Sequence, residues 1–261
     1  METRFFNREL SWIEFNARVL HLALDKKQPL IERLQFLAIV SSNFDEFFQV
    51  RVASIKRLLA ADPKNRDVSG LTPEMQLRQI SARAHQIIRQ QHECLMQDVV
   101  PALAEKGLVY TPPSAFTPRQ NEYTLSLYRS EIYPLLTPLR TDTEEFPHIG
   151  NMTLHAAFLL KPIEGIKSVS EDLKGSDTAP RIALVPVPAG LPRVVWLPSD
   201  SRKEKQFALL DDIIEMYGTQ LFPGFAVEEK MFFNLARDAD FAVDEDSGSN
   251  FIHAMEDVLV Q

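Results

Sequence analysis

The six histidines are the side chains in this sequence best suited to nucleophilic or metal chemistry near neutral pH. His85 and His92 fall on one predicted helix but stand seven residues apart, whereas two ligands of one metal on a helix are spaced by three or four. The others, His21, His148, His155 and His253, are scattered. A histidine nucleophile also needs cations around the charge that develops during transfer, and no such cluster is visible. We therefore predict no catalytic residue and no metal ligand among them.

Two acidic groups also invite a chemical interpretation. Asp45 and Glu46 are adjacent, so in a helix their side chains point about 100° apart and cannot act as a pair. We predict instead that they stabilise a helix start through the helix dipole. A second group runs from Asp238 to Asp246, but it does not place glycine and glutamate where an EF-hand calcium loop needs them. We interpret this group as a solvated turn.

Asn43 is a candidate for binding rather than for catalysis. Its side-chain amide carries two donors and two acceptor lone pairs, which suits a purine edge or a ribose or phosphate oxygen. With Glu46 three residues later it also fits a helix cap, and on the residues alone capping is the favoured role. Phe36 could pack against a purine, but an aromatic residue at this spacing is more often part of a core. No phosphate-loop or dinucleotide glycine motif occurs, so any nucleotide site in this chain would be partial.

Composition places the chain among cytoplasmic globular proteins. Its 261 residues are 45% hydrophobic and 25% charged, which is the balance of a globular protein and enough for two domains. One cysteine, Cys94, excludes a disulfide framework and a thiolate-rich metal site. The start has no signal-peptide pattern, and no apolar run approaches the roughly 20 residues that span a bilayer. Any membrane contact is therefore expected to be peripheral.

The net charge of −8 limits the class of partner. A groove for a nucleic acid or another phosphate polymer needs many cations to replace the counterions that it displaces. This sequence offers only pairs and triplets, such as Lys56 with Arg57. We predict no nucleic-acid partner and no extended polyanion groove made by this chain alone.

The first hundred residues carry helix signals throughout. Ser11 and Glu14 form a capping-box pattern that predicts a helix over about residues 11–25. Its expected apolar stripe consists of Trp12, Phe15, Val19 and Leu22. A second helix starts at Pro29 and ends near residues 41–43, and a third starts at the Asn43 cap, although the two could be nearly continuous. A long helix opens at Thr72, is kinked or restarted by Pro101 and ends at Gly107.

Beyond Gly107 the pattern changes, because 13 of the 17 prolines lie there and short strand signals appear. We predict strands over residues 153–160, 181–187, 193–197 and 227–235, and helices that start at Thr117 and cover about 207–221. A last helix follows the acidic turn and is still running at Val260, so the chain is expected to end inside an element. The predicted fold class is α+β, with a helical domain over 1–106 and a mixed α+β head domain over 107–261, incomplete at its C-terminal end.

Several segments resemble the bacterial polyphosphate kinase family. Residues 6–16 read Phe-Asn-Arg-Glu-Leu-Ser-Trp-Ile-Glu-Phe-Asn, and residues 41–47 read Ser-Ser-Asn-Phe-Asp-Glu-Phe, both similar to the amino-terminal domain of that family. Residues 132–139, Ile-Tyr-Pro-Leu-Leu-Thr-Pro-Leu, and residues 237–240, Arg-Asp-Ala-Asp, resemble its head domain. One departure lies at residues 143–148, where the family more often has His-Pro-Phe-Pro.

The resemblance implies a function that the residues alone do not. Family members reversibly transfer the terminal phosphoryl group of ATP to polyphosphate through a phosphohistidine, which lies in two further domains that would follow Gln261. The asparagine of the Ser-Ser-Asn motif contacts ATP in the family, and Asn43 is the matching position. ATP and inorganic polyphosphate are the implied partners, Mg²⁺ is expected for the full-length enzyme with no ligand identified here, and the head domain implies homo-oligomers. The alternative is a non-enzymatic adaptor or nucleotide-sensing module derived from the family.

Overall fold

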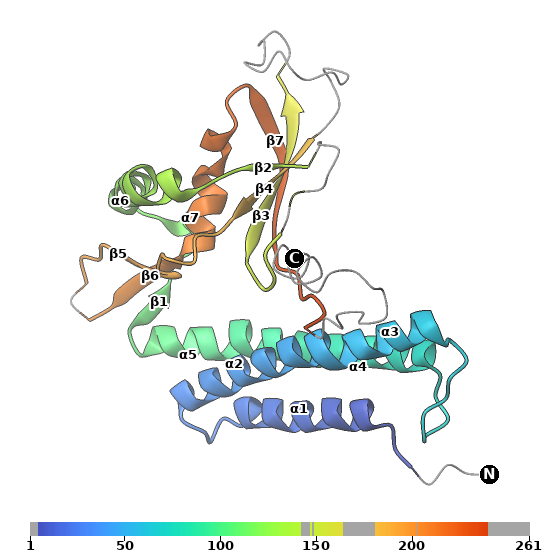
Figure 1. Ribbon diagram of the computed structural model, residues 1–261. Helices are drawn as coiled ribbons and strands as arrows, with labels where there is room; N and C mark the ends of the chain where they lie inside the picture. Colours follow the sequence, from blue (N-terminus) through green and yellow to red (C-terminus); the bar gives the residue numbers. More distant parts are fainter. Residues whose placement is uncertain (1–4, 142–146, 148, 164–180, 202, 240–261) are drawn as a thin grey trace. The chain divides into compact units, whose positions relative to one another are not determined.

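The computed structural model describes residues 5–141, 147, 149–163, 181–201 and 203–239. These residues form two compact units, one made of residues 5–105 with 236–239 and the other of residues 106–235 (Figure 1). The first unit is helical and the second mixes helices with two sheets, so the predicted fold class is confirmed. The domain boundary after residue 106 stays a prediction, because a compact unit is not by itself a segment that folds alone.

Helix α1 (Arg8–Leu24) starts three residues earlier than predicted. Asn7 is its cap, with Oδ1 accepting the N–H of Leu10 at 2.8 Å, whereas Ser11 lies inside the helix. Glu14 cannot close the expected capping box because it pairs with Arg83 instead. The predicted stripe was also centred on the wrong face. Helix α1 packs against both α2 and α4, which buries Ile13, Asn16, Ala17, Leu20 and Ala23 and leaves Phe15 and Leu22 exposed.

The second and third predicted helices form one continuous rod, the nearly continuous alternative of the prediction. It consists of α2 (Leu30–Glu46), the π-helical segment η1 (Phe47–Val52) and α3 (Ala53–Ala61). Asn43 is therefore not a cap, because its carbonyl accepts the backbone N–H of Phe47 within the helix. Asp45 and Glu46 consequently lie inside a helix and not at a helix start, so the predicted dipole role was wrong.

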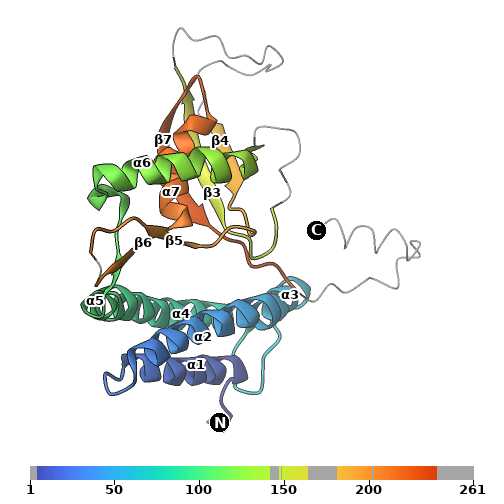
Figure 2. The same cartoon turned by 90° about the vertical axis from the view of Figure 1, so that its left-hand side faces the viewer.

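The third rod of the first unit opens at the predicted cap. Thr72 accepts the N–H of Met75, and α4 (Pro73–Cys94) continues into the π-helical segment η2 (Leu95–Val99) and α5 (Val100–Glu105). A π-helical turn just before Pro101 lets the helix continue although proline lacks an N–H. Gly107, with φ of 85°, ends it as predicted. The rods lie side by side in both views (Figures 1 and 2). No described helix combines the length and apolar character that crossing a membrane requires.

The core of the first unit lies between these rods. Ile13, Leu37, Val40, Phe47 and Ile87 are almost completely buried in it. Two polar residues, Asn16 and Arg33, are buried among these apolar side chains. Both make hydrogen bonds, as buried polar groups must to offset desolvation.

The second unit contains two sheets. The first has the order β1-β6-β5 and consists of β1 (Leu108–Tyr110), β6 (Lys205–Leu209) and β5 (Val194–Leu197), with β1 parallel to β6 and β5 antiparallel to it. The second, antiparallel sheet has the order β2-β4-β3-β7 and consists of β2 (Leu139–Arg140), β4 (Arg181–Pro186), β3 (His155–Pro162) and β7 (Phe225–Phe233). Its predicted strands are present with ends shifted by a few residues.

Helices cover one face of the larger sheet, as Figure 2 shows. They are α6 (Pro118–Leu127), which continues into the π-helical η4 (Tyr128–Ile132), and α7 (Leu210–Tyr217). Short 3₁₀ turns complete the unit: η3 (Pro113–Ala115), η5 (Tyr133–Leu135) and η6 (Gly218–Leu221). The shared core includes Tyr128, Phe158, Val185 and Ile213.

The predicted helix over residues 207–221 was wrong at its start. Residues 205–209 form β6, because this segment pairs with β1 on one side and β5 on the other. Two-sided pairing overrides local helix preference, and the three-residue β1 was too short to recognise in advance. The predicted last helix and the acidic residues that follow Ala239 lie outside the described residues.

Candidate functional site

Asn43, the predicted binding residue, belongs to α2, the helix that packs against α1 in the first unit (Figure 1). Its side chain is half-buried, and its Nδ2 donates to Oδ1 of Asn16 on α1 at 3.0 Å. Asn16 is completely buried and in turn donates from Nδ2 to the carbonyl of Val40 at 3.1 Å. A chain of two hydrogen bonds therefore fixes the Asn43 amide to the neighbouring helix.

This arrangement leaves part of the Asn43 amide available. Its Oδ1 and its second N–H have no hydrogen-bond partner among residues 5–239 that the structure describes. One acceptor and one donor on a planar amide match the hydrogen-bonding edge of a purine. Asn43 can thus bind a ligand without giving up its bond to Asn16.

Aromatic packing makes the support below Asn43 rigid. The Trp12 ring on α1 stacks on Phe47 at 4.4 Å between centroids and contacts Phe44 edge-on at 6.4 Å. Phe48 packs against both phenylalanines. Because Phe44 follows Asn43 directly and Phe47 lies one helical turn after it, this cluster fixes the rotation of the helix that carries the amide.

Apolar side chains share the helix face of Asn43. Phe36 and Ile39 precede it by seven and four residues, a spacing that puts all three on one face of α2. Phe36 is half-buried against the core, whereas Ile39 is 43% exposed. Phe36 is thus mainly a core residue with one side at the surface, and a flat apolar ligand that reached Asn43 would meet this face.

Asp45 has an unusual electrostatic environment. Burial raises the pKa of its carboxyl above the ordinary value of 3.8. No hydrogen bond or ion pair to this carboxylate occurs among the described residues. The π-helical segment η1 begins two residues later, and π-helical turns are rare and frequent near functional sites. Sequence reasoning treated Asp45 only as a helix-dipole residue and missed this burial.

The histidines do not converge in the described structure. His155 is buried, with Nδ1 2.8 Å from the carbonyl of Thr153, and His85 makes the same kind of contact to Ser81 within α4. His92 lines a groove of about 400 Å³ between α2 and α4, together with Leu34, Leu37 and Gln91. Histidines 148 and 253 lie outside the described residues. Within the described chain, no group of three histidine, cysteine or acidic residues could hold a metal ion, so the residues here do not fit a Mg²⁺ site.

Asn16 is the residue that sequence reasoning missed. It positions Asn43, and the available signal was an asparagine among core-facing positions of an amphipathic helix. Such a residue needs a buried partner, and a second asparagine in a helix that packs antiparallel is a natural one. The pair could have been proposed only by knowing that α1 and α2 pack at this register.

Comparison with protein families matches nearly the whole chain to two domain models. The polyphosphate kinase N-terminal domain matches residues 5–111, and the polyphosphate kinase middle domain matches residues 119–261. Curated relatives include the polyphosphate kinase of Halalkalibacterium halodurans, 37% identical over 261 residues, and that of Mycolicibacterium gilvum, 36% identical over 263. These alignments cover 99% and 100% of this chain.

A solved structure agrees with these matches. The crystal structure of polyphosphate kinase from Porphyromonas gingivalis superposes with a TM-score of 0.76 at 30% identity, covering 92% of this chain and 34% of that one. The chain likewise spans about a third of the length of the curated relatives, 35% and 34%. Two family models in the expected order, supported by sequence and fold alike, establish that this chain belongs to the polyphosphate kinase family.

Proposed function

We propose that this chain is the ATP-contacting and assembly part of a polyphosphate kinase, which reversibly transfers the terminal phosphoryl group of ATP to polyphosphate. The family membership carries the proposal. The phosphohistidine and the expected Mg²⁺ would belong to segments like those that make up the other two thirds of the relatives. The enzyme would be a cytoplasmic phosphoprotein that forms homo-oligomers.

Asn43 is the residue that we propose contacts ATP, at the adenine edge or at a ribose or phosphate oxygen. The observation that favours this role is its fixed amide, which retains one acceptor and one donor beside the apolar face of Phe36 and Ile39. Among the described residues of α2 this face carries no cluster of cations, so a phosphate chain would need partners from elsewhere. The site is therefore composite, and the chain alone should bind ATP weakly.

A chimeric enzyme tests this proposal directly. The matching third of the Halalkalibacterium halodurans polyphosphate kinase would be replaced by residues 1–261, and polyphosphate formation from ATP would be measured. We expect activity, and we expect Asn43→Ala to raise the KM for ATP by about two- to tenfold, the effect of one lost neutral hydrogen bond. Asn65→Ala is the matched control, because Asn65 is an exposed loop residue of the same unit.

Three outcomes would contradict the proposal. A correctly folded chimera without activity would exclude a role in this reaction. An equal change of KM in the Asn43 and Asn65 variants would remove Asn43 from the site. Submicromolar binding of ATP by residues 1–261 alone would overturn the composite site and favour the nucleotide-sensing alternative.

A further inference from the structure

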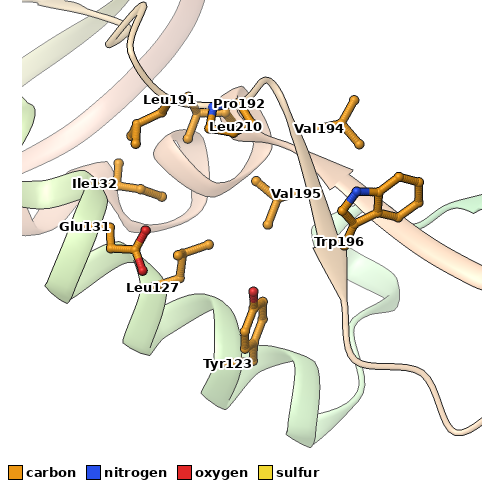
Figure 3. Close-up of a pocket in the computed structure, with 10 residues that line it drawn as sticks. All are labelled: Tyr123, Leu127, Glu131, Ile132, Leu191, Pro192, Val194, Val195, Trp196 and Leu210. Atoms are coloured by element: carbon orange, nitrogen blue, oxygen red, sulfur yellow. The ribbon is translucent and has the colours of Figure 1, made fainter.

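The second unit contains a concave site that the proposed ATP contact does not use. It has a volume of about 200 Å³ and lies between the α6–η4 helix and strand β5, as Figure 3 shows. Its walls are mainly apolar, with Leu127 and Ile132 on the helical side and Val195 on the strand side. Tyr123 adds an aromatic ring at the rim, whereas the ring of Trp196 lies on the other side of β5. The volume is below the roughly 300 to 1,000 Å³ of ordinary ligand pockets, so only a compact molecule would fit.

Both walls of this pocket are held in place. On the helical side Thr117 and Gln120 form a capping box, and Gln120 Nε2 also donates to the carbonyl of Pro198 at the end of β5 at 3.1 Å. On the strand side Trp196 faces Phe207 across β5 and β6, with 6.0 Å between the ring centroids. The pocket is thus preorganised, which lowers the entropy lost on binding.

Strand β5 brings backbone polar groups to the same place. It lies at the edge of its sheet and pairs with β6 alone among the described strands. The N–H of Leu210 donates to the carbonyl of Arg193, which sets the alternation of the antiparallel ladder. The N–H and C=O groups of Val194 and Trp196 therefore point away from β6. They supply hydrogen-bond partners at the rim of the pocket.

Charge decides which ligand suits the pocket. Glu131 is the single charged residue among the ten that line it, and this exposed carboxylate has no ion-pair partner among the described residues. Arg129, two residues away, lines a different depression on the opposite face of the helix with Glu122. An anion would meet only repulsion from Glu131.

We propose that this pocket binds a small organic cation, an ammonium or guanidinium group carried on a compact apolar or aromatic body. The body packs between Leu127, Ile132 and Val195, and the charged group pairs with Glu131. The proposal is independent of ATP binding, because the pocket lies wholly in the second unit and Asn43 lies in the first.

Fluorine NMR of the 261-residue chain labelled with fluorotyrosine tests the proposal. The chain has five tyrosines, so Tyr123 reports on the pocket and the other four serve as internal controls, with Tyr123→Phe to assign its signal. The probes share a phenyl body: phenethylamine is a cation, 2-phenylethanol is neutral and 3-phenylpropionate is an anion. We expect phenethylamine to shift the Tyr123 signal and to bind up to about tenfold more tightly than the alcohol.

Two carboxylate variants locate the charge preference. Glu131→Gln should abolish the preference for the amine over the alcohol, while Glu122→Gln, on the same helix but outside the pocket, should retain it. Equal affinity for the three probes would overturn the proposal. So would an absent Tyr123 shift, or a loss of preference in Glu122→Gln that matches the loss in Glu131→Gln.

Discussion

Arg33 connects three helical segments of the first unit through one buried guanidinium group. Its Nε donates to the carbonyl of Ala23 at the end of α1 at 2.6 Å, and Nη2 donates to Asp98 in η2 at 2.7 Å. The same nitrogen lies 3.6 Å from Sγ of Cys94. The carbonyl of Ala23 belongs to the last turn of α1, where helix carbonyls lack partners, so Arg33 acts as a C-terminal cap from a neighbouring helix.

Replacing Arg33 should therefore destabilise the chain. Arg33→Met removes the cap and leaves the buried carbonyl of Ala23 with only the weak thiol donor of Cys94 at 3.6 Å, and we expect a loss of about 2–3 kcal/mol in urea unfolding. Arg89→Met, an exposed arginine on α4, is the control and should stay within about 0.5 kcal/mol. An equal effect of the two variants would exclude the capping role.

The loss of unfolding free energy caused by Arg33→Met should also depend on pH. The hydrogen bond from Arg33 lowers the pKa of Asp98 below its ordinary value of 3.8. A carboxyl with a depressed folded-state pKa stabilises the fold above the unfolded pKa, and this stabilisation is lost as pH falls through the folded pKa. The difference between wild type and Arg33→Met should accordingly narrow below about pH 3.8 and be largest at neutral pH.

Replacing Asp45 should have the opposite effect on stability from replacing Arg33. Burial raises its folded-state pKa above 3.8, so folding disfavours the ionised carboxylate at neutral pH. Asp45→Asn should therefore stabilise the fold at pH 7 and raise its melting temperature. The gain in free energy of unfolding should stay below about 1 kcal/mol, because the group stays partly solvated. The gain should disappear below pH 3.8, where the carboxyl is protonated in both states. Glu46→Gln, at an exposed neighbouring position, should change little at either pH.

For single residues, the sequence identified Asn43 as a candidate but did not predict the side chains that surround it. The family resemblance selected Asn43, whereas local capping rules assigned it a helix start that does not exist. The rules failed because Asn–x–x–Glu spacing occurs equally well inside a helix, and core packing of Phe44 and Phe47 keeps this helix running. Asn16 depends on a contact 27 residues away, which no local pattern encodes.

Among the structural elements, the start of β1 depends on one glycine. Gly107 has φ of 85°, and a Cβ there would lie 2.6 Å from the carbonyl oxygen of Lys203. Its own carbonyl accepts the N–H of Lys205, which begins the parallel pairing of β1 with β6. A side chain at this position would strain the backbone and push the two strands apart.

Gly107→Ala should therefore lower stability by about 1–3 kcal/mol. Gly190→Ala is a matched control, since a Cβ at residue 190 meets nothing within 4 Å and the backbone there is not left-handed. Thermal unfolding of both variants followed by circular dichroism would measure the difference. Equal melting temperatures would show that the strands can shift without cost.

Helix starts were predictable where a side chain caps them, as at Thr72 and Thr117. Helix continuity was not, because π-helical segments carry the rods past residues that usually interrupt a helix. Short strands such as β1 and β2 were also missed. They exist only because longer strands pair with them, which is a property of the sheet and not of their two or three residues.

At the scale of the whole molecule, the two units have separate cores that share no residue. Ile87 is completely buried in the first core and Ile213 in the second. If the units unfold independently, calorimetry should resolve two transitions, with Ile87→Ala lowering one and Ile213→Ala the other by about 2–5 kcal/mol each. A single transition that both variants lower would show that the chain unfolds as one cooperative unit.

The path of the chain has a practical consequence for genetics. After β7 the chain comes back to the first unit, where the N–H of Ala239 donates to the carbonyl of Gln49 and Asp238 pairs with Arg57. At the level of the gene, the second unit is therefore an insertion into the first. A clone that stops at codon 105 would omit the segment that binds η1 and α3. A deletion that joins codon 105 to codon 236 would keep it and is the better starting point for displaying the helical unit alone. Because α5 ends at the opposite end of the helical unit from α3 (Figures 1 and 2), a Gly/Ser linker must be long enough to run along the helices.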